Sequence, residues 1–286
     1  MYKDINFNLS LILSIKAKTK PMKTATITII TAFLMLTSCN ANSENGFSLN
    51  ITSKEGTGII KNKEYIMSFD EIRVAQSINA EVVKSDEEKV VVTAPSDILE
   101  DVLVENNNGK LYIHFKPNLN ISARNIAVKI FAKDFSAVKA SSSASILIKD
   151  QFTQDRMSIE SSSSGDITGN LEANEMTIAV SSSGSFTGKI WAVDLKSEVT
   201  SSGDIAISGK SKNANLSASS SGSLNAKNMI VENADVKASS SGDVSLSVSN
   251  QLNASASSSG GIEISRKGNL NIISQKESSG GSISIQ

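Results

Sequence analysis

Three aspartates have types and a spacing that could support hydrolytic chemistry. Asp166, Asp204 and Asp243 each follow a Gly in a short phrase that recurs along the second half of the chain. In stacked β-strands with a spacing of ~4.8 Å, two windings would separate neighbouring carboxylates by about 9.5 Å. That distance lies within the range of an inverting glycosidase, so a polysaccharide-cleaving enzyme is one hypothesis.

The other copies of the phrase favour a structural interpretation of the same position. There the residue is small, and Ser, Asp and Gly are the usual exchange set of a turn. These residues are Ser145, Ser185, Ser223, Gly261 and Ser282. The phrase contains no Arg, His or Tyr that could orient a substrate. We therefore expect no catalytic residue and no enzyme, and we keep the three aspartates only as a candidate surface strip.

Metal or cofactor binding has little support in the sequence. A Gly-Asp repeat can ligate calcium, but the known calcium-binding coil has about half the present period and supplies several oxygens per ion. His114, the only histidine, lies on an expected strand, facing outward without a cysteine or second histidine beside it. Trp191 is interpreted as filling a groove rather than as a platform for a sugar. No phosphate-loop or dinucleotide fingerprint occurs, so we expect neither metal nor cofactor.

The only cysteine, Cys39, stands at the end of an apolar segment. Lys23 precedes an uncharged run, 24–38, which has the length of a signal-peptide core and is too short for a stable membrane anchor. The run ends in Leu-Thr-Ser-Cys, which resembles the bacterial lipoprotein cleavage box. We expect residues 1–38 to be a leader that is removed and Cys39 to carry a lipid, which makes the membrane a partner.

Charge and cysteine content narrow the range of partners. Cleavage before Cys39 removes five of the 28 basic side chains and one of the 29 acidic ones, which leaves a net charge of −5. A weakly acidic protein lacks the clustered Lys and Arg that nucleic acids require, so no nucleic-acid partner is expected. With its one cysteine acylated, the protein has no disulfide, and its stability must come from packing.

A repeated phrase organises the region 140–286. It consists of a Ser cluster, a Gly slot, one small or acidic residue and an apolar residue. The slot is occupied by Ala144, Gly165, Gly184, Gly203, Gly222, Gly242, Gly260 and Gly281, with gaps of 21, 19, 19, 19, 20, 18 and 21 residues. A period near twenty without insertions predicts an all-β solenoid, in which each winding stacks on the previous one.

Apolar residues keep a fixed phase relative to the Gly slot. Two residues after it stand Ile146, Ile167, Phe186, Ile205, Leu224, Val244, Ile262 and Ile283. Eight residues before it stand Met157, Met176, Leu195, Ala214, Ala234, Leu252 and Ile273. We expect two or three short strands per coil and an internal ladder of aliphatic side chains. At each corner, Gly is expected to supply a positive φ, while serine hydroxyls pair along the column or satisfy corner amides.

The region before the repeat is expected to comprise a tether and a β section. Residues 39–58 are polar and read as a flexible tether, whereas 59–139 alternate as strands do and form one body with 140–286. Strands are expected at 66–74, 78–84, 90–94, 111–116 and 125–132, with a helical turn at 95–99. Asn106-Asn107-Asn108-Gly109 predicts a hairpin turn, since Asn and Gly accept positive φ.

Several segments together resemble the bacterial head GIN domain family, named for autotransporter adhesins and common among Bacteroidetes lipoproteins. They are Phe69-Asp70-Glu71-Ile72, Ile78-Asn79-Ala80-Glu81-Val82, 89–94, Ile98-Leu99, 108–113 and the Ser-Gly refrain. The resemblance covers 66–286. It implies a right-handed parallel β-helix-like solenoid with an N-terminal β section, located outside the cytoplasm and without an established enzymatic activity. A plain Ser replaces the first Gly of the family's refrain, which leaves this fold expectation intact.

Two functional hypotheses of different classes remain. One is a lipid-anchored module of the cell envelope, on the outer membrane, that displays a polar surface to an unknown envelope protein or glycan. The other is a passive structural or assembly protein that forms homo-oligomers through its terminal coil, because the last strand near Ile283 would expose an edge. The sequence after Cys39 leaves periplasmic and surface-exposed placement both open.

Overall fold

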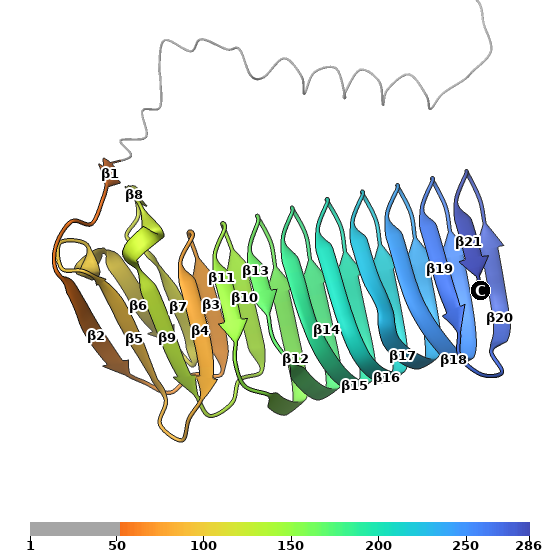
Figure 1. The fold of residues 1–286 in the computed structure, drawn as a ribbon, viewed down its shortest axis with the longest axis horizontal. Coiled ribbons are helices and arrows are strands. Elements are labelled where there is room, and N and C mark those ends of the chain that lie inside the picture. Colours follow the sequence, from red (N-terminus) through yellow and green to blue (C-terminus); the bar gives the residue numbers. More distant parts are fainter. Residues whose placement is uncertain (1–51) are drawn as a thin grey trace, which may run out of the picture. The chain divides into compact units, whose positions relative to one another are not determined.

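The protein folds as a stack of β-strands. A computed structural model describes residues 52–286, which belong to one compact unit, Asn50–Gln286. The strands of this unit lie side by side, with pointed turns along one edge and broader bends along the opposite edge (Figure 1). The solenoid predicted from the repeat is thereby confirmed. The expected leader and Cys39 lie outside the described residues.

Strands and two 3-10 helices make up the regular structure of the described residues. The N-terminal section contains β1 (Thr52–Lys54), β2 (Ile60–Ile66), β3 (Glu71–Ala75), β4 (Asn79–Lys84), β5 (Lys89–Pro95), η3 (Leu99–Asp101), β6 (Val102–Asn107), β7 (Lys110–Phe115), β8 (Leu119–Ile121), η4 (Ala123–Asn125) and β9 (Ala127–Ala132). The solenoid contains β10 (Ala137–Ser141), β11 (Ser145–Ile148), β12 (Phe152–Ser161), β13 (Asp166–Thr168), β14 (Leu171–Val180), β15 (Ser185–Val199), β16 (Asp204–Ala218), β17 (Ser223–Ala238), β18 (Asp243–Ala256), β19 (Gly261–Arg266), β20 (Asn271–Glu277) and β21 (Ser282–Ile285). Strands β15 to β18 each pass through a bend and therefore carry both sides of a coil.

The coils stack in parallel register around an aliphatic ladder. Each coil consists of a strand approaching a serine turn, the turn, a strand leaving it, and a bend. The position two residues after the Gly slot pairs between coils, as Ile167 does with Phe186 and Phe186 with Ile205. This column is buried from Ile146 to Ile262, which confirms the apolar phase predicted from the sequence.

The second ladder departs from the expectation in the last coil. Met176, Leu195 and Ala214 stack in register, and the column continues through Ala234 to Leu252 as predicted. After Leu252 the register shifts by one residue, so that Leu252 pairs with Ile272. Ile273 therefore points outward and is 56% exposed. The constant offset of eight residues fails here because a bulge inserts one extra residue into the strand.

The serine turns place positive φ on different residues from those expected. In the third coil, Ser182 and Ser183 have φ values of 51° and 60°, and the amide of Gly184 donates to the carbonyl of Ser181 at 2.9 Å. Two successive positive φ values define a type I′ turn. The same pattern recurs along the column, with serine φ values between 48° and 64°. The prediction that the slot Gly supplies the positive φ is wrong.

Gly occupies the slot in seven of the eight copies because the preceding coil lies close to it; only the first copy has a side chain there, the methyl group of Ala144. A Cβ at Gly184 would lie 2.7 Å from the carbonyl oxygen of Ser161. Any larger residue would push the two coils apart. The turns are also joined to one another, since the amide of Ser183 donates to the carbonyl of Ser201 at 3.1 Å. These contacts hold the serines in a backbone region that non-Gly residues otherwise avoid.

One further coil precedes the repeat without carrying its phrase. Gln76 and Ser77 have φ values of 61° and 58° and connect β3 to β4. The amide of Ser77 donates to the carbonyl of Ser142 at 2.9 Å, so this turn stacks on the first serine turn. Strands β3 and β4 pair with β10 and β11. The stacking geometry thus begins one coil earlier than the sequence pattern.

Strands β7 and β9 pair in parallel with β3 and β4 of the first coil, and antiparallel strands follow them. Strand β5 pairs antiparallel with β2 and β9, and β6 pairs with β7 across the hairpin predicted at 106–109, which is confirmed. Strands β2, β6 and β8 were not among the expected strands. The short helical segment, Leu99–Asp101, begins at the end of the range expected for it, 95–99. Four of the five expected strands are bounded within two residues of their predicted ends, and the exception is 66–74, where β3 begins only at Glu71.

Residues 52–58 belong to the fold rather than to the expected tether, 39–58. Strand β1 pairs with β8, and the amides of Thr57 and Gly58 donate to the Asp97 carboxylate at 3.0 and 2.9 Å. Those two backbone hydrogen bonds hold the pKa of Asp97 below its usual value. The buried Asp101 receives Lys54 Nζ at 2.5 Å and Lys116 Nζ at 3.2 Å. Burial raises the pKa of Asp101, but the two ammonium groups outweigh it, and the net shift is downward.

Candidate binding groove

The three aspartates of the candidate surface strip lie in one outward-facing column. Asp166 pairs with Ser185 and Ser185 with Asp204, and the column continues through Ser223 to Asp243. A serine therefore separates each aspartate from the next. The hydroxyl of Ser185 donates to the carboxylate of Asp166, while Asp204 and Asp243 are exposed. Their positions on the sheet are equivalent, whereas paired-carboxylate hydrolysis needs two different environments.

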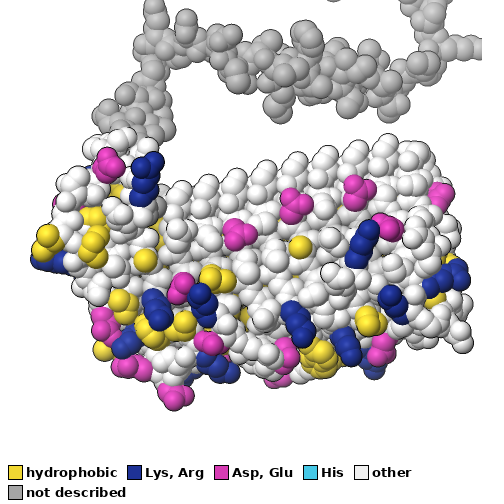
Figure 2. Space-filling view, viewed as in Figure 1, with side chains coloured by type: hydrophobic (Ala, Val, Ile, Leu, Met, Phe, Trp, Pro, Cys, Tyr) yellow, Lys and Arg dark blue, Asp and Glu magenta, His cyan; other side chains and the backbone are white. Residues whose placement is uncertain are grey.

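The two edges of the solenoid differ in surface chemistry. Figure 2 shows uncharged polar side chains and backbone along the turn edge, while Lys, Arg and hydrophobic side chains gather along the bend edge. Trp191 and Ile230 are 45% and 42% exposed and belong to one column, with Lys210 between them. The interpretation of Trp191 as the filler of a groove is wrong, because nearly half of its surface faces solvent.

A groove of about 520 Å³ lies along the strands that approach the serine turns. It crosses five consecutive strands, β14 to β18. Its lining consists of Glu175, Met176, Thr177, Asp194, Leu195, Lys196, Asn213, Ala214, Asn215, Asn233, Ala234, Asp235, Gln251 and Asn253. The volume lies within the range of small-molecule sites, so the groove is large enough to hold part of a ligand.

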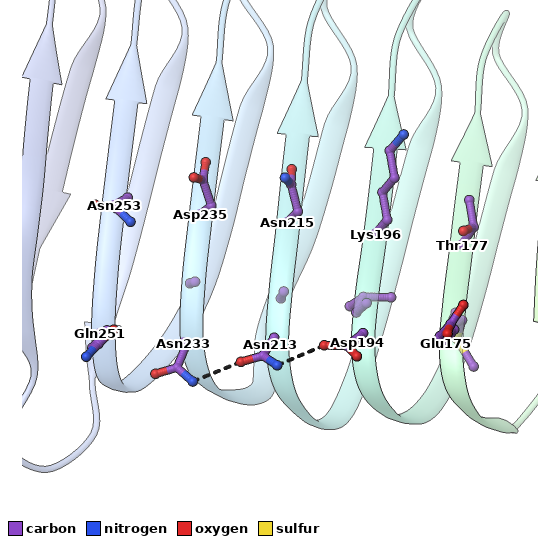
Figure 3. A pocket seen from close by; sticks show the side chains of 14 residues that line it. Glu175, Thr177, Asp194, Lys196, Asn213, Asn215, Asn233, Asp235, Gln251 and Asn253 are labelled. Carbon is purple, nitrogen blue, oxygen red and sulfur yellow. Dashed lines mark hydrogen bonds between the residues drawn. The ribbon is translucent and has the colours of Figure 1, made fainter. Parts of the chain in front are cut away.

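Two rows of polar side chains form the walls of the groove (Figure 3). The first row is Glu175, Asp194, Asn213, Asn233 and Gln251, and the second row is Thr177, Lys196, Asn215, Asp235 and Asn253. The residue between the rows in each strand, such as Leu195 or Ala214, points into the core and is buried. Five strands at ~4.8 Å spacing give each row a length of about 19 Å.

A ladder of hydrogen bonds fixes the first row. Asn233 donates to Asn213 at 2.9 Å, and Asn213 donates to the Asp194 carboxylate at 2.8 Å (Figure 3). The carboxamide of Asn250, outside the groove lining, donates to Asn233 at 2.8 Å. Each bond uses one N–H and one acceptor site of a side-chain amide. Asn213 and Asn233 therefore each keep one N–H and one acceptor site for a ligand. Because their orientations are already set, little side-chain entropy is lost on binding.

The groove carries a weak negative charge. Three carboxylates, Glu175, Asp194 and Asp235, line it together with one cation, Lys196. Arg156 Nε lies 3.1 Å from Glu175 Oε2, and Lys237 Nζ lies 3.9 Å from Asp235 Oδ1. The balance disfavours polyanionic ligands and leaves both hydrogen-bond donors and acceptors on display.

Sequence reasoning missed this groove, although the signal for it is present. The first row stands nine residues before the Gly slots, and the second row stands seven residues before them. Both offsets hold polar residues in all five coils of the groove, while the position between them is apolar. The repeat was analysed for its apolar phase, and its polar positions were interpreted only around the serine turn. A polar residue at a constant offset is equally periodic and marks a continuous outer wall.

His114 occupies a more enclosed position than expected. Its ring stacks on Tyr112 with centroids 4.1 Å apart, and Nδ1 lies 2.8 Å from the carbonyl oxygen of Phe115. The guanidinium of Arg73 lies 4.5 Å above the Tyr112 ring. His114 alternates with the buried residues of β7 and faces outward from the strand as expected, but neighbouring side chains cover it and leave its side chain only 13% exposed. It serves as part of a stack between β3 and β7.

Within residues 52–286, no group of three or more His, Cys, Asp and Glu side chains is arranged to hold a metal ion. In the same part of the chain, no helix has the length and apolar character needed to span a membrane.

The stacked coils define the chain as a β-solenoid protein. A family model described as "Putative auto-transporter adhesin, head GIN domain" matches residues 68–189 and 169–268. These matches cover well over half of the chain, so the protein belongs to this family. The resemblance inferred from the sequence is confirmed. No curated protein matches the chain.

Three solved structures share the fold. They are a "putative adhesin" from Parabacteroides merdae (16% identity, TM-score 0.74, 82% of this chain and 99% of that chain), a "putative adhesin" from Parabacteroides distasonis (22%, 0.72, 80% and 99%) and a "Putative lipid binding protein" from Parabacteroides distasonis (24%, 0.70, 82% and 100%). At these identities the likeness shows the fold alone. The match over nearly the whole length of each neighbour supports one architecture for both the N-terminal section and the solenoid.

Proposed function

We propose that the protein is an adhesin-like binding module of the cell envelope, held to the outer membrane by a lipid on Cys39 and without enzymatic activity. Membership of a family described as adhesins supports the binding role. The groove across β14 to β18 is the observation that carries the proposal, because it presents two rows of polar side chains in fixed register. A site built on regular strands holds its contact groups in place without a conformational change.

Binding accounts for the polar surface better than catalysis does. Asp204 and Asp243 stand exposed on the outer face of one sheet, with a serine between them in the column. A catalytic acid and base of a glycosidase flank the scissile bond and differ in their surroundings. Neither Asp166 nor Asp204 lines the groove across β14 to β18. The polar groups therefore serve contact rather than proton transfer.

The lipid anchor rests on the sequence at 24–39. An apolar run followed by Leu-Thr-Ser-Cys places the only thiol of the chain where lipoprotein processing would acylate it. A diacylated or triacylated cysteine supplies more than one chain, which is what stable membrane attachment requires. The polar residues that follow would then separate the solenoid from the bilayer.

The proposal is tested on cells that express the full chain. Incorporation of an alkyne-labelled fatty acid is expected, and Cys39→Ser is expected to abolish it. Protease added to intact cells is expected to digest the solenoid if it faces outward. Cells expressing the protein are expected to adhere to glycan-coated or protein-coated surfaces more than cells carrying an empty vector.

Three results would contradict the proposal. Labelling that persists in Cys39→Ser would contradict the lipid anchor on Cys39. Adhesion equal to that of the empty-vector cells would contradict the binding role. Release of reducing ends from a polysaccharide, lost in Asp204→Ala, would replace binding by hydrolysis.

A further inference from the structure

We propose that the groove across β14 to β18 binds a linear oligosaccharide, neutral or N-acetylated, that runs along the axis of the solenoid. This inference rests on the proposed binding function and names the ligand class of the same protein. It follows from three properties of the groove: the chemistry of its walls, its charge and its length.

The walls match the chemistry of sugar hydroxyl groups. A hydroxyl both donates and accepts, and each carboxamide does the same. Asn213 and Asn233 keep a free N–H and a free acceptor site beside the bonds of their ladder. The second row, which forms the opposite wall, adds the carboxamides of Asn215 and Asn253. Strands β16 and β18 therefore offer carboxamides on both sides of a bound chain, Asn213 and Asn215 in the first case and Gln251 and Asn253 in the second.

Charge and composition separate a neutral sugar from the other polymers. The lining holds three carboxylates and one lysine, and a sulfated or uronic acid chain would meet the carboxylates of Glu175 and Asp194 along the first wall. The lining contains no Trp, Tyr or Arg, which are the residues that dominate the energetics of protein–protein interfaces. A neutral or N-acetylated sugar is the polymer that fits both features.

The length of the groove points to a chain rather than to a single sugar. Each row crosses five strands and is about 19 Å long. The register is unbroken where the rows lie, as in the pairing of Asp194 to Lys196 with Asn213 to Asn215. A ligand that lay across the rows would contact only one or two coils. A ligand along the axis would meet two polar side chains in every coil, so affinity is expected to grow with each added sugar.

The test uses the full chain, purified with its anchor in detergent and immobilised on a sensor surface. The probes are β-linked glucose and N-acetylglucosamine oligomers of increasing length, with heparin as the anionic comparison. Affinity for the neutral probes is expected to rise with length and to level off once the probe spans about 19 Å. Heparin is expected to bind no better than the monosaccharide.

Variants locate the site. Asn233→Ala removes one member of the ladder and is expected to weaken binding roughly three- to tenfold. Asn215→Trp fills the opposite wall from an exposed position and is expected to abolish binding while the unfolding temperature stays unchanged. The matched control is Asn225→Ala, in the part of β17 that leaves the serine turn and outside the groove lining. Like Asn233, Asn225 accepts a hydrogen bond from the next coil, from Ser245 at 3.3 Å. This control is expected to bind like the parent.

Three outcomes overturn the inference and leave the adhesive role intact, and a fourth refutes both. Binding that survives Asn215→Trp, or is lost in Asn225→Ala, places the sugar elsewhere on the solenoid. Cells that adhere to protein-coated but not to glycan-coated surfaces, together with no binding of any sugar probe, make the ligand a protein. Preference for heparin assigns the site to an anionic chain. Absence of both sugar binding and cell adhesion refutes the proposed function itself.

Discussion

The turn edge and the bend edge of the solenoid follow different rules. Every serine turn of the repeat has the same I′ geometry, and the turns are linked amide to carbonyl from one coil to the next. Outside the turns, register shifts occur between Ala206 and Ser208, between Ala226 and Ile230, and after Leu252. Variation in coil length is therefore absorbed in the strands and bends and not in the serine turns.

The difference shows where such a fold can vary without losing its stack. The uniform edge aligns each coil on the one before, and the variable edge is left free to change in length and side-chain type. The first row of the groove begins directly after the bends, at Asp194, Asn213 and Asn233. The first-row residues lie between a bend that differs from coil to coil and a turn that is the same in each coil. Their residue type can therefore vary while their position in the stack stays fixed.

The aliphatic ladder gives the largest test of this comparison. Ile205→Asp would bury an unpaired charge beside Phe186 and Leu224, which stack on either side of it. A loss of stability of about 4 kcal/mol or more is expected, enough to unfold the solenoid. Circular dichroism during thermal unfolding measures it. The neighbouring Asp204→Ser exchanges one turn residue for another and is expected to leave the unfolding temperature unchanged. Equal effects of the two substitutions would contradict the stacked core.

The Gly slot tests the turn edge more gently. Gly184→Ala adds a Cβ 2.7 Å from the Ser161 carbonyl oxygen, and relieving this contact is expected to cost about 1–3 kcal/mol. The matched change on the bend edge is Asn228→Ala, at an exposed position, where an effect within about 0.5 kcal/mol is expected. Urea unfolding at constant slope compares the two. A tolerant slot and a sensitive bend would reverse the roles assigned to the two edges.

The N-terminal section contains a buried carboxylate held by two ammonium groups, whereas an ion pair of the solenoid such as Arg156–Glu175 is exposed, and pH separates the two regions. Because Lys54 and Lys116 hold the folded-state pKa of Asp101 below its usual value, the carboxylate stabilises the fold above the unfolded pKa of about 3.9. That contribution is lost as pH falls through the lower, folded-state pKa. Asp101→Asn is expected to cost about 1–2 kcal/mol at neutral pH and to flatten the acid limb of the stability curve. An unchanged acid limb in the variant would rule out this role for Asp101.

Ser197 offers the smallest effect and the opposite sign. It is 1% exposed at a ladder position between Ile178 and Leu216, and its hydroxyl has no hydrogen-bond partner among the described residues. Ser197→Ala removes an unsatisfied polar group and is expected to raise the free energy of unfolding by about 1 kcal/mol. Chemical denaturation measures it. A destabilised variant would mean that the hydroxyl has a bonding partner in solution.

The last coil differs from the interior coils in a way that bears on self-association. Gln275 and Glu277 stand at the ladder positions that Ala254 and Ala256 fill in the preceding coil. The Glu277 carboxylate accepts the amide of Ile283 at 2.8 Å. Polar groups at core-facing positions hinder pairing of a terminal coil with another edge. This feature counts against the hypothesis of homo-oligomers through the terminal coil.

Features that recur in every repeat could be predicted from the sequence, whereas features that depend on contacts between neighbouring coils could not. The column from Ile146 to Ile262 follows from periodicity alone, because each member fills the same place. The reason for the Gly slot could not be found in the same way, since it depends on the carbonyl of the previous coil. The turn at Gln76 and Ser77 has the backbone geometry of the serine turns but lacks their repeated sequence. The groove arises from two columns seven and nine residues before each slot, and only stacking shows that they face each other.

Close registration of successive coils also makes the length of the molecule adjustable in whole units. Asp204 stacks on Ser185, and Ser223 stacks on Asp204. Deleting 204–222 would therefore join Gly203 to Ser223 at a point where Ser223 can rest directly on Ser185. In a chain whose contacts are confined to adjacent windings, such an excision leaves both flanking interfaces of familiar shape. Gene duplication or loss of a single period could then lengthen or shorten the ligand-facing wall without redesigning its interior.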